Sequence, residues 1–66
     1  MNKDKVKESI TKKLDKYIST LEKRVKNQDE MSIFYFKGIC DGLMFILKDC
    51  CFDTYDYYYK KINMIL

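Results

Sequence analysis

Residues 24–36 read RVKNQDEMSIFYF, and the polar run at the centre of this stretch, residues 27–30, interrupts a pattern that is helical on both sides. Asn27 with a glutamate three positions later fits a capping box at the start of a second helix, and Asp29 followed by Ser32 fits nearly as well. Either start predicts a tight turn that folds two helices into a hairpin. The run contains neither Gly nor Pro, so the competing prediction is one continuous helix.

The segment before the turn, residues 3–26, is predicted to form the first helix. Its apolar residues recur every three or four positions, and it contains no helix breaker. Asn2 is the predicted N-cap, and Asp4 in the first turn lies near the positive end of the helix dipole. The apolar stripe comprises Val6, Ile10, Leu14, Tyr17, Ile18, Leu21 and Val25.

The segment after the turn, residues 28–51, is predicted to form a second helix that is apolar on more sides than one partner helix covers. We expect one face to pack against the first helix and the opposite face to carry both glycines of the chain. The first face comprises Phe36, Ile39, Cys40, Leu43, Ile46, Leu47 and Cys50. The second face comprises Phe34, Gly38, Asp41, Gly42, Phe45, Lys48 and Asp49.

Gly38 and Gly42 require an explanation, because glycine inside a helix costs up to about 1 kcal/mol relative to alanine. Their spacing of four residues leaves a strip of backbone without side chains, which allows a second helix or a bulky aromatic to approach closely. The strip is filled either by another helix of the same chain or by a second protein. The predicted protein interface comprises Phe34, Gly38, Asp41, Gly42 and Phe45, together with Tyr57.

A short third helix is predicted over residues 54–65, with Asp53 or Thr54 as its N-cap. A helix of this length is marginal alone, so we expect its apolar face to pack on the hairpin. The sequence thus predicts an all-α fold in which residues 1–66 form one small domain, a helical hairpin plus a short C-terminal helix.

Tyrosines dominate this third segment. Tyr55, Tyr58 and Tyr59 are either half-buried core residues or part of a protein-binding surface, where tyrosine is enriched. Tyr57 falls on the other side of the helix, and we expect it to be exposed.

A chain of 66 residues is short for a stable core. At this size only about 60% of the unfolded chain's surface is buried on folding, and roughly 4,000 Å² of apolar burial is needed to offset the chain entropy. We therefore expect added stability from self-association, with a dimer favoured, or from an unidentified protein partner.

The net charge of +3 resides in the first helix, since residues 1–30 hold nine basic and six acidic residues while residues 31–66 hold four of each. A second hypothesis is therefore a small nucleic-acid-associated regulator that contacts phosphates. The interspersed acidic residues are typical of a solvated helix face, and neither later helix has the polar outer face of a recognition helix. The candidate phosphate contacts are Lys12, Lys16, Lys23 and Arg24.

Catalysis and the binding of metals or cofactors are not expected. The chain has no His and no Gly-rich phosphate loop, and we expect Asp41 to form a surface salt bridge. Cys40, Cys50 and Cys51 form no C-x-x-C pair, so we expect buried, reduced thiols in a cytoplasmic protein. Neither a secretory signal nor a membrane-spanning segment is predicted, because the longest unbroken apolar run in the richest apolar window covers only residues 43–47.

A Y/F-x-x-G-x-x-x-G-L-like pattern lies in the second helix and comprises Phe34, Tyr35, Phe36, Lys37, Gly38, Gly42 and Leu43. In this pattern the chain resembles short Lys-rich helical-hairpin proteins of phages and mobile elements of low-GC bacteria. Some of these proteins inhibit host defence, including anti-CRISPR proteins, so the resemblance implies action in the host cytoplasm. We predict a non-enzymatic protein-binding module, a small inhibitor or adaptor that occupies the surface of a larger protein.

Overall fold

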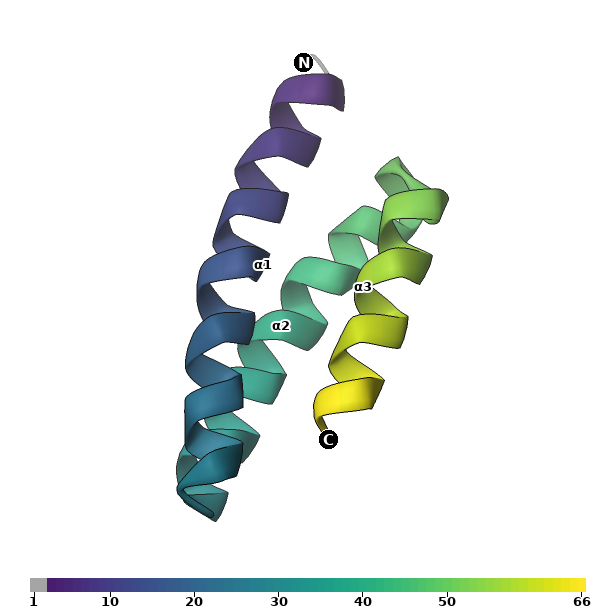
Figure 1. Cartoon of the computed structure of the whole chain (residues 1–66). Helices are drawn as coiled ribbons and strands as arrows, with labels where there is room; N and C mark the ends of the chain where they lie inside the picture. The colour runs from purple at the N-terminus through teal and green to yellow at the C-terminus, as the bar shows by residue number, and fades with distance from the viewer. Residues whose placement is uncertain (1–2) are drawn as a thin grey trace.

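The protein is all-α, and the computed structural model, which describes residues 3–66, contains three helices joined by short connections (Figure 1). α1 and α2 form the predicted hairpin, and α3 is the predicted short C-terminal helix. α2 begins at Glu30 rather than at residue 28, and α3 begins at Phe52 rather than at residue 54. The predicted cap at Asn2 lies outside the described residues. The helices are α1 (Lys3–Lys26), α2 (Glu30–Cys50) and α3 (Phe52–Ile65).

The turn between α1 and α2 ends the first helix without glycine or proline. Gln28 adopts the left-handed conformation, with φ 56°. Its N–H donates to the carbonyl of Val25 at 3.1 Å, and the N–H of Asp29 donates to the carbonyl of Arg24, also at 3.1 Å. These two bonds form a Schellman motif, which satisfies the last carbonyls of a helix and turns the chain away from its axis.

Asp29 also starts α2, so the structure uses the second of the two predicted caps. Its carboxylate accepts the backbone N–H of Ser32 at 3.3 Å and the hydroxyl of Ser32 at 2.7 Å. These hydrogen bonds hold the pKa of Asp29 below its ordinary value. Because the pKa of Asp29 is lower in the folded state, its hydrogen bonds stabilise the fold at pH values above the pKa of the unfolded carboxyl. This stabilisation is lost as the pH falls through the folded-state pKa.

Replacing Gln28 with glycine is expected to raise the free energy of unfolding by about 1 kcal/mol, because a left-handed residue with a Cβ is strained and glycine is not. Urea unfolding followed by circular dichroism measures the change. Gln28→Ala is the matched control: it keeps the Cβ, so it should give no gain. A glycine variant no more stable than the alanine variant would contradict this interpretation of the turn.

Cys51 alone joins α2 to α3. Its backbone is extended, its N–H donates to the carbonyl of Leu47 at 2.7 Å, and its carbonyl accepts the N–H of Tyr55 at 3.0 Å. The prediction that Asp53 or Thr54 caps α3 is wrong. Cys51 takes the N-cap position, and both candidates lie within the first turn of α3. The hydroxyl of Thr54 instead lies 3.1 Å from the Cys51 thiol, and this contact lowers the pKa of the thiol.

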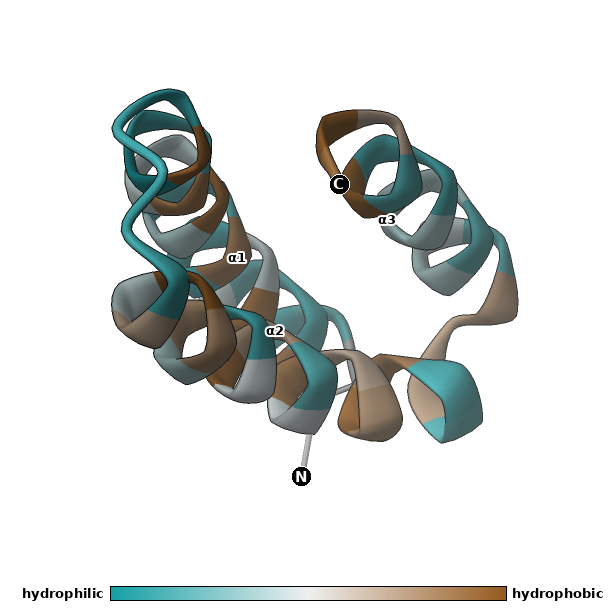
Figure 2. Ribbon diagram, turned by 90° about the horizontal axis from the view of Figure 1, so that it is seen from below, coloured by the Kyte–Doolittle hydropathy of each residue, from teal (hydrophilic) through white to brown (hydrophobic). Residues whose placement is uncertain are grey.

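The core lies between α2 and the two other helices, which both lie on one side of it (Figure 2). Tyr58 ties α3 to α1, because its hydroxyl donates to the carboxylate of Asp15 at 2.7 Å. Met44, which was assigned to neither face from the sequence, is buried. The buried residues are Ile10, Leu14, Ile18, Leu21, Cys40, Met44, Leu47, Tyr58 and Ile62.

The three cysteines carry no disulfide and differ in burial. Cys40 is buried as predicted, and burial raises the pKa of its thiol. The prediction of a buried thiol is wrong for Cys50 and Cys51, which are half-buried because they lie at the junction between α2 and α3. Within residues 3–66 no helix is both long and apolar enough to cross a membrane.

Candidate protein-binding surface

The side of α2 that faces away from α1 and α3 is largely apolar and exposed; Figure 2 shows it along the bottom of the molecule. Its residues recur three, four and seven positions apart, so they form one continuous strip along the helix. We call this strip the outer face of α2. It comprises Met31, Phe34, Tyr35, Gly38, Gly42, Phe45 and Ile46.

Gly38 and Gly42 lie at the centre of the outer face. A methyl group placed on either glycine would meet no side chain and no other helix of the described residues within 4 Å. Both glycines have ordinary helical backbone, since the glycines show no positive φ. Neither close packing within residues 3–66 nor an unusual backbone conformation therefore accounts for them.

The residues predicted as an interface fall into two groups. Phe34, Gly38, Gly42 and Phe45 lie together on the outer face of α2. Asp41 lies at the edge of that face and accepts a hydrogen bond from Lys37 at 2.9 Å, the surface ion pair expected from the sequence. Tyr57 lies on α3 and belongs to a different surface.

Tyr57 is exposed, as predicted, and lies beside a shallow hollow on the outer side of α3. The ammonium group of Lys61 lies 5.8 Å from the centre of its ring, within the range of a cation–π contact. Lys60 and Met64 complete the lining of the hollow. This surface is smaller and more basic than the outer face of α2.

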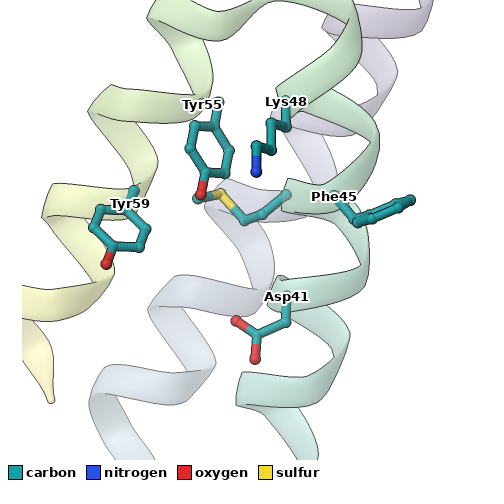
Figure 3. Close-up of a pocket in the computed structure, with 6 residues that line it drawn as sticks. Asp41, Phe45, Lys48, Tyr55 and Tyr59 are labelled. Atoms are coloured by element: carbon teal, nitrogen blue, oxygen red, sulfur yellow. The ribbon is translucent and has the colours of Figure 1, made fainter.

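A groove of about 200 Å³ separates α2 from α3 next to the outer face (Figure 3). This volume is below the roughly 300–1,000 Å³ of typical small-molecule sites. Phe45 points away from the two tyrosines of the groove and toward the outer face, whereas Asp41 points into the groove. The groove is lined by Asp41, Met44, Phe45, Lys48, Tyr55 and Tyr59.

Three residues of the outer face were missed or misplaced from the sequence. Met31 and Tyr35 were not selected, although they lie seven and three residues before Gly38 and so share its side of the helix. Ile46 was assigned to the face against α1, but its side chain is 47% exposed. The assignment was wrong because α1 covers a narrower arc of α2 than the apolar pattern occupies.

The tyrosines of α3 divide between core and surface. Tyr58 is buried and Tyr55 is half-buried, whereas Tyr59 is half exposed and lines the groove. The rings of Tyr55 and Tyr59 stack at 5.8 Å. The core interpretation therefore holds for Tyr58 and for Tyr55, which packs against the core, whereas Tyr59 belongs to the surface.

Three of the four basic residues proposed as phosphate contacts have a charged or aromatic neighbour within the chain. Lys12 pairs with Glu8 at 3.2 Å, and the ammonium group of Lys16 lies 5.9 Å from the ring centre of Tyr17. Arg24 is half-buried beside the carboxylate of Asp29, 3.9 Å away. Lys23 is exposed.

Comparison of the chain with protein-family models, with curated proteins and with solved structures finds no match. The outer face of α2 is therefore interpreted from its own residues and geometry.

Proposed function

We propose that the protein is a non-enzymatic protein-binding module, a small inhibitor or adaptor that acts by occupying the surface of another protein. The observation that carries the proposal is the outer face of α2, where large apolar side chains are exposed on both sides of two open glycines. Contiguous apolar patches of this kind mark interaction sites in small proteins.

The composition of the outer face supports a protein as the ligand. Aromatic residues and Met are enriched in protein interfaces, and charged residues are depleted at their centres. The outer face is rich in exposed aromatic residues and Met, namely Met31, Phe34, Tyr35 and Phe45. The charged pair of Lys37 and Asp41 lies at the edge, where a polar rim is expected.

Capture from a host extract tests the proposal. A tagged wild-type chain is compared with Phe45→Lys on the outer face of α2 and with Met64→Lys on α3, both exposed positions where lysine leaves the core intact. We expect mass spectrometry to identify proteins retained by the wild type and by Met64→Lys but lost with Phe45→Lys. Retention of the same proteins by all three chains would place binding elsewhere.

The nucleic-acid hypothesis is tested separately. Because Lys12, Lys16 and Arg24 have acidic or aromatic neighbours and acidic residues are interspersed along α1, we expect no retention of duplex DNA even at low salt. Measurable binding that falls steeply as salt rises, and that is lost with Lys12→Glu and Lys16→Glu together, would replace the protein-binding proposal with the regulator.

A further inference from the structure

We infer that the outer face of α2 binds a second copy of this chain, in a twofold dimer whose α2 helices run antiparallel and cross at the glycines. The inference rests on the proposed function, because it names a partner for the same surface. It is carried by the order of side chains on the face, by the charges at its edge and by the area it exposes.

Between residues 34 and 46 the outer face has the same order of large and small residues in both directions from its midpoint at residue 40, and beyond these residues Met31 lies at the position equivalent to Asp49. Each glycine is followed outward by a bulky pair: Phe34 and Tyr35 beyond Gly38, and a second pair, residues 45 and 46, beyond Gly42. A twofold axis between the two glycines places Gly38 opposite Gly42 of the second copy. The bulky pair of one copy then meets the bulky pair of the other, which is the self-complementarity that a twofold interface requires.

The open glycines allow the two helices to approach closely. Small residues four positions apart let helix backbones pack against each other. In the single chain nothing within residues 3–66 uses this strip, although each glycine lowers helix stability relative to alanine. A second α2 helix uses both glycines at once.

The charges at the edge of the face favour the antiparallel arrangement. In a face-to-face antiparallel pair, the same edge of each helix faces its counterpart. The Lys37–Asp41 ion pair of one copy then lies beside the reversed ion pair of the second copy, so that the two Asp41 carboxylates lie next to the axis with a lysine on either side of them. In a parallel pair this charged edge would instead face the apolar edge that carries Ile39 and Ile46, which would desolvate the ion pair against apolar side chains.

The net positive charge does not oppose this dimer. The surplus of basic residues lies in α1, which holds nine basic and four acidic residues. α1 packs on the side of α2 opposite the outer face (Figure 2). The two basic helices therefore lie on the outside of the dimer, far from each other.

The exposed area is sufficient for a small interface. The chain exposes 5005 Å², against about 4,500 Å² for a compact monomer of its mass. Phe34, Tyr35 and Phe45 are 73%, 65% and 72% exposed and together offer about 400 Å² of apolar surface, to which Met31 and Ile46 add. Two copies together therefore bury about 800 Å² through these three residues, and Met31 and Ile46 bring the total to the lower end of specific interfaces, so we expect a dissociation constant on the order of micromolar.

Sedimentation velocity over a range of concentrations tests the inference. The wild type should shift from the 8.0 kDa monomer to twice that mass as its concentration rises through the micromolar range. Gly42→Leu should raise the dissociation constant by about 100-fold, because each copy inserts a bulky side chain at the crossing.

The Gly42→Leu variant should remain folded by circular dichroism, since its new side chain points into open space in the single chain. Ser19→Leu, which adds the same side chain on the exposed side of α1, is the matched control and should dimerise like the wild type.

A charge exchange tests the orientation. Lys37→Glu replaces the lysine on each side of the two Asp41 carboxylates with a further carboxylate and should weaken the dimer by about 10-fold. Combining Lys37→Glu with Asp41→Lys restores opposite charges within and between the copies and should restore the wild-type dissociation constant. An unchanged dimer in Lys37→Glu would overturn the antiparallel arrangement.

The outcomes separate this inference from the proposed function. A chain that stays monomeric at all concentrations but captures a foreign protein through the outer face overturns the dimer and leaves the proposed function standing. A dimer that dissociates with Gly42→Leu, in a chain that captures no other protein, supports the inference and removes the inhibitor or adaptor role. A dimer insensitive to Gly42→Leu overturns the inference, because its interface lies elsewhere.

Discussion

Replacing both Gly38 and Gly42 with alanine is expected to raise the free energy of unfolding of the monomer by about 1–2 kcal/mol, because each exchange gains helix propensity. The added methyl groups meet no side chain and no other helix within the described residues, so no steric cost offsets the gain. For a domain of this size the gain corresponds to a rise in melting temperature of about 5–15 °C.

Thermal and urea unfolding at a concentration below the dimerisation range measure this effect. Ser19→Ala, on the exposed side of α1, is the matched control for an alanine exchange that involves no glycine, and it should change stability by less than the double exchange. A double variant less stable than the wild type would show that the glycines pack against part of the folded chain. A gain would mean that two stabilising methyl groups are missing from the natural sequence, which is the pattern of a surface kept for binding.

Tyr58→Phe is expected to lower the free energy of unfolding by about 1.5–3 kcal/mol at neutral pH, because it removes a hydrogen bond to a charged carboxylate. Tyr58 is 6% exposed, and its hydroxyl donates to Asp15 at 2.7 Å. This bond is a polar link between α3 and α1, so we expect the loss to loosen α3 first. Urea unfolding of the wild type and the variant measures the difference.

The effect of Tyr58→Phe should depend on pH. Burial, and then the hydrogen bond and negative charge of Asp15, raise the pKa of Tyr58 well above its ordinary value. A raised folded-state pKa contributes stability that is complete below the pKa of the unfolded tyrosine, about 10, and declines as the pH rises further. The stability difference between the wild type and Tyr58→Phe should therefore shrink above that pH.

Tyr57→Phe provides the control, since Tyr57 is exposed on the same helix. It should change stability by less than about 0.5 kcal/mol and leave the alkaline pH dependence unchanged. A difference between the wild type and Tyr58→Phe that stays constant with pH would contradict the hydrogen bond between Tyr58 and Asp15 as the source of the effect.

The helices and most of the core were predictable from the sequence because they depend on periodicity. The stripe of α1 places Ile10, Leu14, Ile18 and Leu21 in the core, as their spacing predicts. The ends of α2 and α3 were less predictable. Gln28 adopts a left-handed conformation that glycine or asparagine usually takes, and two candidate caps of similar quality compete within residues 27–29.

The arrangement of the candidate site was predictable only in part. The spacing of Phe34, Gly38, Gly42 and Phe45 places them on one side of a helix, and they lie together in the structure. Whether another helix of the chain covers that side depends on how α3 docks, which local sequence does not encode. The bond between Tyr58 and Asp15 spans 43 positions in the sequence, and no periodicity relates two residues that far apart.

The connections between the helices have a consequence for how the chain folds. Residues 27–29 and Cys51 alone separate the three helices, so each helix packs mainly on its neighbour in the sequence. Closing such short loops costs little entropy, and proteins dominated by local contacts fold in microseconds to milliseconds. During folding the apolar residues of each helix are therefore exposed to water only briefly before they pack against the neighbouring helix.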